Sequence, residues 1–551
     1  MSDTGKVNAN LTIGTQGSAS MSANSITSAV SNSGNLSLSG GTVSKAISGS
    51  GTTTLKGNTT NSAGINQGVK VNSGITLTNN AALGSASGSV TNAGTINSSA
   101  DNIKGTVSNT GSLNLSGGTL SKAVSGSGKT TITGNTTNSG GINQGVTVNS
   151  GVTLTNNAAL GSDSGTITNS GTINTSASNI KGAVTNNNTL NLSGGTLSKA
   201  VSGSGTTNIT GAVTSNSAIS QAINIIAAGD LTISAGNIGG AVTNAGDLIL
   251  TGGTLSKAVS GAGLTTISGN TTNNGGINQA VKVNSGVTLA NNAALGSANG
   301  AITNAGTINS NADYIKGTVA NSGSLNLSGG TLSKAVSGSG TTNITGNTTN
   351  NAGINQGVNI NNGVTLTNNA ALGSDSGKIT NAGTINTNAS NIKGTVTNNN
   401  ALNLSGGTLS KAVSGNGTTT ISGNTTNNAG INQGVNVNSG VTLTNNAALG
   451  SDNGKITNAG TINTNANNIK GAVTNNNALN LSGGTLSKAV SGSGTTTISA
   501  NATNNGGISQ KVNVSSGVTL TNNAALGSDS GVVTNSGTIN TSASNIKGAV
   551  T

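Results

Sequence analysis

Hydrophobic and polar residues alternate over short stretches of this chain, and each stretch then breaks off. In residues 92–168 the alternation places Leu113 and Leu115, then Ile132, then Leu154 at positions flanked by polar or small residues. Alternation with a period of two predicts short strands that bury one side. Each stretch opens with an Asn-x-Gly or Gly-x-Gly word, and these words predict corners because Gly and Asn adopt turn conformations at low cost.

A second recurring word has one apolar residue, then three other residues, then a second apolar residue. It runs from Ile103 to Val107 and from Leu120 to Val124. The three residues between the apolar ones continue neither the alternation of a strand nor the longer apolar repeat of a helix, so the word predicts a bend that turns both ends inward. Together the words predict two or three short strands per turn of chain, with a turn every 17–23 residues.

The chain is also built from near-copies of one block. The word Leu-Ser-Gly-Gly-Thr or Leu-Thr-Gly-Gly-Thr, followed by Val or Leu and Ser-Lys-Ala, begins at Leu38, Leu115, Leu192, Leu250, Leu327, Leu404 and Leu481. Five of the six intervals have the same length, and only the one from Leu192 to Leu250 is shorter, so one block has lost a slice the size of a single turn. Such periodicity is typical of a stack of repeated units, which can lose one layer without disturbing the next.

We therefore predict an all-β protein, a parallel β-solenoid (right-handed β-helix) of about 28 coils of 17–23 residues, grouped in 77-residue blocks of four coils. Residues 1–31 are predicted to form an irregular N-terminal coil or cap. Residues 32–551 are predicted to form one continuous β-solenoid, whose blocks start at 32, 109, 186 (the short one), 244, 321, 398 and 475. Composition alone would also fit a disordered polar tract, but the regular supply of Ile, Leu and Val argues against that.

The polar composition fits a stack as well. Pro is absent, as expected where almost every strand is internal and needs its N–H. Asn recurs at the corners, and stacked Asn side chains form amide ladders. The predicted corner file is Asn92, Asn109, Gly126, Asn149, Asn169 and Asn186.

Composition excludes most chemistry. The chain has no His, Glu, Arg or Cys, so it lacks the usual base of a nucleophilic triad and the usual soft metal ligands; we predict no catalytic, cofactor-binding or metal site, and no enzyme. Copies of Asp163 one block apart would stand about 19 Å apart along a stack, too far for a glycosidase carboxylate pair. The net charge of +12 comes without stacking aromatics, which argues against nucleic acid. No apolar run is long enough to span a membrane.

The charged residues do recur in register. Ile-Lys-Gly, Ser-Lys-Ala and Gly-Ser-Asp words occupy equivalent bends on neighbouring coils, which predicts a charged edge. Its members are Lys104, Lys122, Asp163, Lys181, Lys199, Lys257, Lys316, Lys334, Asp375, Lys393, Lys411, Asp452, Lys470, Lys488, Asp529 and Lys547. Two interpretations stay open: a solubilising edge with weak exposed pairs, or a Lys stripe that meets anionic glycans or lipopolysaccharide.

Several words resemble those of a known family. Asn-Ser-Gly-Thr-Ile-Asn from Asn169, Asn-Ala-Gly-Thr-Ile-Asn from Asn92 and Asn304, and the word from Gly492 are similar to words of bacterial autotransporter passenger domains, including self-associating adhesins, and more distantly to filamentous haemagglutinin. The resemblance implies a right-handed β-helix on a Gram-negative cell surface, working in adhesion, autoaggregation or as a stalk. No signal peptide or aromatic-rich translocator barrel is visible, so we expect an excised passenger segment.

The function that follows is a structural, non-catalytic extracellular protein, a surface adhesin or stalk that acts by multivalent weak contacts. Its expected partners are cell-surface glycans or other copies of itself. The alternative is a self-assembling filament or matrix protein built by end-to-end stacking, since open strand edges invite pairing. The Thr-rich words also suggest an ice-binding protein. This alternative is a minor one, because the Thr residues do not form one uninterrupted row along the coils.

Overall fold

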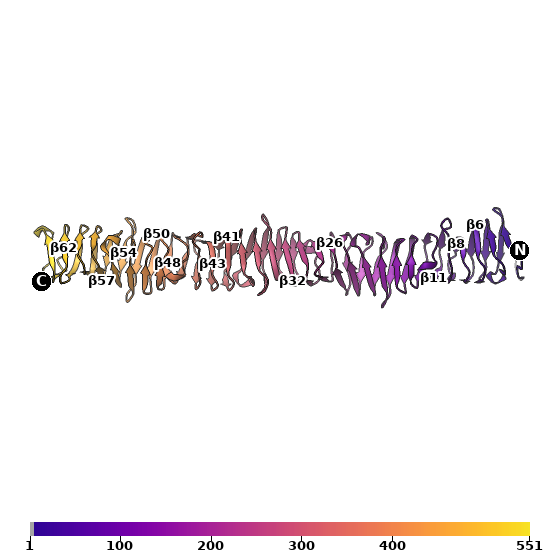
Figure 1. Cartoon of the computed structure of the whole chain (residues 1–551), viewed down its shortest axis with the longest axis horizontal. Helices are drawn as coiled ribbons and strands as arrows, with labels where there is room; N and C mark the ends of the chain where they lie inside the picture. The colour runs from indigo at the N-terminus through magenta and orange to yellow at the C-terminus, as the bar shows by residue number, and fades with distance from the viewer. Residues whose placement is uncertain (1–4) are drawn as a thin grey trace. The chain divides into compact units, whose positions relative to one another are not determined.

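The chain is a parallel β-solenoid, as predicted. The computed structural model describes residues 5–551, and the chain divides into two units, Met1–Gly276 and Ile277–Thr551. Over residues 5–551 the solenoid has about 31 turns. Figure 1 shows the strands lying side by side within each unit, indigo to magenta in the first and pink to yellow in the second.

One coil has three faces. In the first unit, β12 (Val107–Asn109), β13 (Ser112–Leu115) and β14 (Gly118–Leu120) follow one another around a coil. We call the faces that they occupy the first, second and third face of this unit. The next coil begins with β15 (Val124–Ile132), which turns a corner: its start pairs with β12 and its end pairs with β13. Then β16 (Thr136–Asn138) pairs with β14 and completes the coil.

The coils above continue these faces in parallel register. Pairing on the second face runs through β15, β17, β19, β21 and β24, and on the third face through β14, β16, β18, β20, β22, β25 and β27. The bounds are β17 (Ile142–Val148), β18 (Thr153–Asn156), β19 (Ile167–Asn169), β20 (Thr172–Thr175), β21 (Val184–Asn186), β22 (Thr189–Leu192), β23 (Gly195–Leu197), β24 (Val201–Ser202), β25 (Thr206–Ile209) and β27 (Ala222–Ile225).

The predicted inward residues form the core. Leu113, Leu115, Val124 and Leu154 are fully buried, and each stacks on an inward residue of the coil below or above. Burying one such side chain contributes about 1.5–3 kcal/mol. Because no Phe or Trp is present, the interior is filled by interlocking Ile, Leu and Val.

The predicted bend between Ile103 and Val107 is present, and a short 3₁₀ helix leads into it. Eight such helices stand at equivalent places, each followed by an Ile whose N–H closes the turn: Ala23–Ser25, Ala100–Asn102, Ala177–Asn179, Ala235–Asn237, Ala312–Tyr314, Ala389–Asn391, Ala466–Asn468 and Ala543–Asn545. Ser or Asn precedes each helix, and Asn388, for example, accepts a hydrogen bond from the backbone N–H of Ser390 at 2.9 Å, the usual capping role of that residue type.

The paired glycines of the repeated word have a structural reason. Gly117 has φ +126° and Gly118 has φ +88°. Residues other than glycine rarely adopt a backbone conformation with φ in this range. A Cβ on Gly118 would also lie 2.1 Å from the carboxylate of Asp101. The word therefore turns into β14 only with glycine at both positions.

A block does not contain a whole number of coils, which the repeated words did not predict. On the third face, four coil steps lead from Leu120 to Leu192, five residues short of Leu197, the copy of Leu120 in the next block. One coil step is typified by the one from Asn138 to Asn156, a separation of 18 residues. A block such as 109–185 therefore holds four coils and a fraction of another. This remainder explains why the chain has about 31 turns rather than the 28 predicted.

Because of this remainder, each block begins one face further around the coil than the block before it. β12 lies on the first face, whereas β21, its copy one block later, lies on the second face above β19. The second unit behaves in the same way: Val490 stands four coil steps above Thr419, not above its own copy Val413. A given word thus returns to the same face only after three blocks, or about 13 coils and roughly 60 Å. The charged words of successive blocks therefore lie at different corners, and the single charged edge predicted from the sequence is divided among them.

The short block keeps this turn. Three coil steps lead from Leu192 to Asn244, six residues short of Leu250, the copy of Leu192. The segment that this block lacks therefore corresponds to one coil, and the coils that follow keep their register.

Part of the predicted ladder of Asn residues at the corners is present. Asn92 donates to Asn109 and Asn169 donates to Asn186, both at 2.7 Å and fully buried. Asn149 is not in the file: Asn169 stacks on Val148, and Asn149 is exposed. The error arises because β17 ends at Val148, which occupies the stacked corner position, so that the Asn-x-Gly word from Asn149 begins one residue after it.

The N-terminal residues that are described also form coils. β1 (Leu11–Ile13) pairs with β3 (Val30–Asn32), and β2 (Ser18–Met21) pairs with β4 (Asn35–Leu38). Residues 1–4 of the segment predicted as an irregular coil or cap lie outside the described residues.

Candidate charged clusters and amide groove

Each Gly-Ser-Asp word forms a tight turn that lifts its Asp out of the coil. In the first unit, the N–H of Gly165 donates to the carbonyl of Ser162 at 3.1 Å and the reverse bond measures 3.3 Å. The Asp163 side chain at the tip is 89% exposed. The turn presents the carboxylate beside the coil above.

A lysine two coils further on reaches three of these carboxylates, those of Asp163, Asp375 and Asp452. The Lys199 Nζ lies 2.6 Å from Asp163 Oδ1 and the Lys411 Nζ lies 2.5 Å from Asp375 Oδ1. Lys488 and Asp452 form the same pair. Each pair spans 36 residues, so it bridges over one intervening coil.

That intervening coil carries a second lysine in each cluster, namely Lys181, Lys393 or Lys470. All three are exposed. In the second unit, Asp452, Lys470 and Lys488 line a surface hollow of about 640 Å³ together with Asn467 and Thr485. Each cluster therefore carries one negative and two positive charges.

The lysines lower the pKa of the aspartates with which they pair. The hydrogen bond from Lys199, and then its positive charge, hold the pKa of Asp163 below its ordinary value of 3.8, against a smaller opposing effect of desolvation. Lys411 and Lys488 lower the pKa of Asp375 and Asp452 for the same reasons. Because these carboxylates are solvent-exposed, the pairs contribute little to stability.

The remaining members of the predicted edge do not join such clusters. Lys122 and Lys334 stand where the loop two coils below carries Ala86 and Ala298 instead of Asp, and the short block that precedes Lys257 lacks the loop. Lys104, Lys257, Lys316, Asp529 and Lys547 are exposed. Within residues 5–551, the ion pairs are the three described above.

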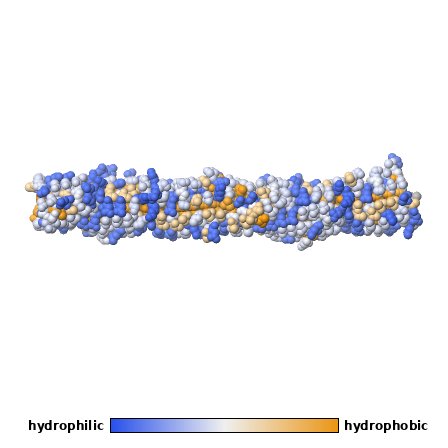
Figure 2. All heavy atoms as spheres, in the orientation of Figure 1, coloured by the Kyte–Doolittle hydropathy of each residue, from blue (hydrophilic) through white to orange (hydrophobic). Residues whose placement is uncertain are grey.

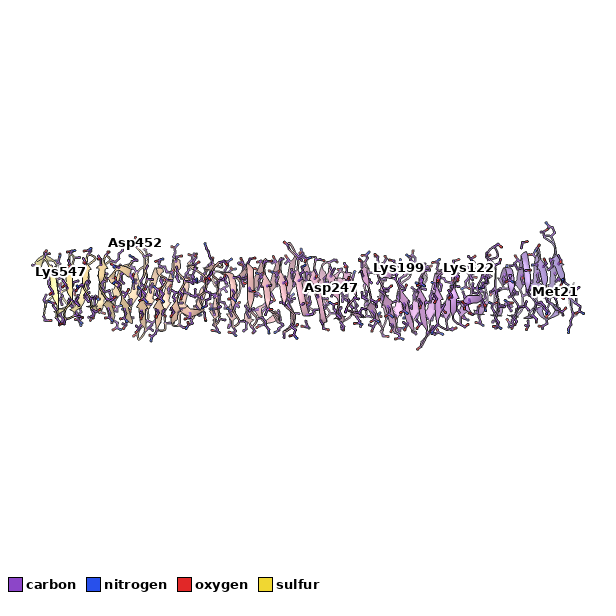
Figure 3. The ribbon with its side chains drawn as sticks, viewed as in Figure 1. Met21, Lys122, Lys199, Asp247, Asp452 and Lys547 are labelled. Carbon is purple, nitrogen blue, oxygen red and sulfur yellow. The ribbon has the colours of Figure 1, made fainter. Side chains whose placement is uncertain are left out.

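Nor do the Ser-Lys-Ala lysines of successive blocks form one stripe. Lys122 follows Leu120 and leaves the third face, whereas Lys199, labelled with it in Figure 3, follows Leu197 and leaves the first face. The charged edge is therefore divided into separate corners, one block at a time. On the side drawn in Figure 2, polar residues predominate and hydrophobic ones show in narrow strips.

A second recurrent feature is a groove lined by amides and hydroxyls, which we call the amide groove. In the first unit it lies over the third face, has a volume of about 650 Å³, and extends from Thr155 to Ile226. The matching groove of the second unit has about 410 Å³ and extends from Thr367 to Ser422. Each residue lining the second groove is the block copy of one lining the first.

An outward-facing Asn ladder forms the floor of the first groove. Asn191 donates to Asn174 and Asn208 donates to Asn191, each at 2.7 Å, and Asn224 donates to Asn208 at 3.1 Å. All four side chains are half-buried. The corresponding bond in the second unit joins Asn403 to Asn386 at 2.8 Å.

The corner words predict the buried Asn file, but the prediction missed this outer ladder. Its signal is the polar position between two inward residues, as in Leu190-Asn191-Leu192 and Thr207-Asn208-Ile209. Parallel in-register stacking turns that alternation into a continuous row of amides.

The Asp residues, the only residue type of this chain among the common metal ligands His, Cys, Asp and Glu, are spread along the sequence. Among residues 5–551 no three His, Cys, Asp or Glu side chains lie close enough together to hold a metal ion. In the same range, no helix is long and apolar enough to cross a membrane.

Comparison with known proteins gives no relative: no protein-family model, no curated protein and no solved structure matches this chain.

Proposed function

We propose that this protein is a non-catalytic surface adhesin or stalk, of the kind its resemblance to autotransporter passenger domains suggests, and that it acts by many weak contacts. The observation that carries the proposal is the recurrence of the same surface features in separate blocks. Three Asp–Lys clusters share one geometry, and the amide groove occurs in both units with matching residues.

Recurrence has a direct energetic consequence. Individually weak contacts become strong when several are made by one chain, since each contact after the first is intramolecular. Affinity for a surface that carries many copies of a ligand should therefore grow with the number of blocks. Cell-surface glycans are the partners we propose, in an extracellular setting.

The test compares the full chain with variants that lack one or two whole blocks, for binding to bacterial and host cell surfaces. We expect binding to fall with each block removed. Binding that is unchanged by block removal would mean one discrete site and would overturn the multivalent mechanism. Long fibres of the chain alone, seen by electron microscopy, would instead favour the end-to-end filament.

A further inference from the structure

The amide groove has the lining of a ligand site, and its chemistry indicates which ligand. We propose that it binds a single chain of a neutral, hydroxyl-rich polysaccharide. The inference rests on the proposed function, because it assigns the repeated contact to a specific surface and ligand class.

Two parallel rows of polar groups form the groove of the first unit. One is the Asn ladder, from Asn174 to Asn224. The other is a row of hydroxyls on the neighbouring corner, Ser176, Ser193 and Thr210, which all line the same groove. Both rows repeat once per coil, about every 4.8 Å, and from Thr155 to Ile226 the groove crosses four coil steps, or about 19 Å.

The hydrogen-bonding capacity of the ladder selects for hydroxyl groups. A side-chain amide has two N–H donors and two acceptor lone pairs. Asn191 uses one N–H toward Asn174 and one lone pair toward Asn208, so one donor and one acceptor remain. A hydroxyl can both donate and accept, whereas a carboxylate only accepts and an ammonium group only donates. Sugar hydroxyls therefore match both remaining groups.

The corner row adds acceptors. Ser193 and Thr210 donate their hydroxyl protons to the carbonyls of Thr175 and Leu192, at 3.3 and 3.1 Å. Their oxygens retain acceptor capacity toward a ligand. At the end of the groove, Ile226 is 38% exposed and provides an apolar contact for the C–H face of a sugar ring.

Charge is absent from the groove. None of its lining residues in either unit is Lys or Asp. The Asp163–Lys199 cluster lies where the chain leaves the first face toward the second, on the opposite side of the coil from the third face. Exposed charges are screened beyond about 8 Å at physiological ionic strength, so the cluster does not attract an anionic chain into the groove.

The turn of one face per block further restricts the ligand. The Asn97–Asn114 ladder lies on the second face, and its copy, the Asn174–Asn191 ladder, lies on the third. Successive ladders thus point in different directions. A flexible soluble chain can enter each in turn, whereas a rigid flat surface such as crystalline cellulose or ice meets one direction at a time.

The test uses the full chain and three soluble probes: dextran and a β-mannan as neutral polysaccharides, and polygalacturonate as an anionic one. Affinity electrophoresis should show retardation by at least one neutral probe, with no change between 50 and 500 mM salt. The variant carries Asn191→Thr and Asn403→Thr, because Thr131 and Thr420 already stand in equivalent strands. We expect at least a tenfold loss of affinity with unchanged hydrogen exchange of the core strands.

The matched control carries Lys199→Ala and Lys411→Ala, which removes charge outside the groove and should leave polysaccharide binding unchanged. The groove assignment would be overturned if neither neutral probe bound, if the Asn variant bound as well as the unchanged chain, or if the chain preferred polygalacturonate. It would also be overturned if the neutral probes retarded an unfolded control polypeptide such as casein to the same extent. Cell binding that scales with block number while both neutral probes fail would leave the proposed function standing without this groove.

Discussion

The inward and outward residues of one strand have very different consequences for stability. Leu115 is fully buried, whereas Ser112 on the same strand is exposed. We expect Leu115→Asp to open its coil and the two neighbours, because an unpaired charge would stand between apolar rows at a cost above about 3 kcal/mol. Ser112→Asp should leave the strand intact. Amide hydrogen exchange along β11–β15 is the measurement (β11 is Thr95–Ser98), because a repeat array opens locally; equal protection in both variants would contradict the assignment.

The Asn of the Gly-Asn-Thr-Thr words has a role that its exposure conceals. Asn135 Oδ1 accepts a hydrogen bond from the backbone N–H of Thr153, one coil above, at 2.8 Å. Asn135→Ala should therefore weaken that contact by about 1 kcal/mol and speed exchange of the Thr153 amide about fivefold. Asn143→Ala is the control, since Asn143 is an exposed strand residue in the next coil, and it should leave the Thr153 amide unchanged.

The ion pairs give a small and directional pH dependence. The pKa of Asp163, Asp375 and Asp452 is lowered in the folded chain. Their contribution is therefore present above the ordinary carboxyl pKa of 3.8 and disappears as the pH falls through the lowered folded value. Carboxyl titration by NMR should show all three pKa values below the ordinary carboxyl value of 3.8, and Lys199→Ala should return that of Asp163 alone to its ordinary value. An Asp163 pKa that does not respond to this change would mean the pair does not form in solution.

At the scale of the coil, the sequence predicts the elements well because each word carries its own local cause. Alternation predicts strands such as β13, and the Ile103-to-Val107 spacing predicts a bend, since both depend on neighbouring residues. The outer ladder and the place of Asn149 depend instead on which residue stacks on which in the next coil. That register is set by coil lengths that vary from word to word, and a single word does not encode it.

The coil as the structural unit leads to a deletion experiment. Thr442 pairs with Thr461 and Asn445 pairs with Thr464, so removing residues 446–464 joins equivalent points of adjacent coils. We expect the shortened chain to keep its β-structure by circular dichroism and its exchange protection in the coils above, as the short block does naturally. Removing residues 446–455 takes out about half a coil and should unfold the coils around the junction, because it brings outward residues to inward positions. Equal effects of both deletions would contradict these coil boundaries.

At the scale of the whole chain, the repeat unit and the structural unit differ. The sequence repeats once per block, the chain completes more than four coils over the same length, and the mismatch turns each block by one face. An alignment of the words alone shows the first period and conceals the turn, which is why the predicted charged edge becomes separate corners. Any surface function of the blocks must therefore work in three directions.

This turn can be measured directly within the second unit. Thr420 and Ser491 lie in one column, four coil steps apart through Asn436, Thr457 and Thr474. Ser414 is the block copy of Ser491, yet it lies on the preceding face with Asn432.

The chain has no Cys, so pairs of introduced cysteines can carry spin labels without background. Labels at Thr420→Cys and Ser491→Cys should report a separation close to the axial rise of four coils, about 19 Å. Labels at Ser414→Cys and Ser491→Cys should report a clearly longer distance, since they add a displacement between faces to a similar rise. If the Ser414 pair gave the shorter distance instead, blocks would stack face on face, and both the three-way display of the clusters and the preference for a flexible ligand would fall with it.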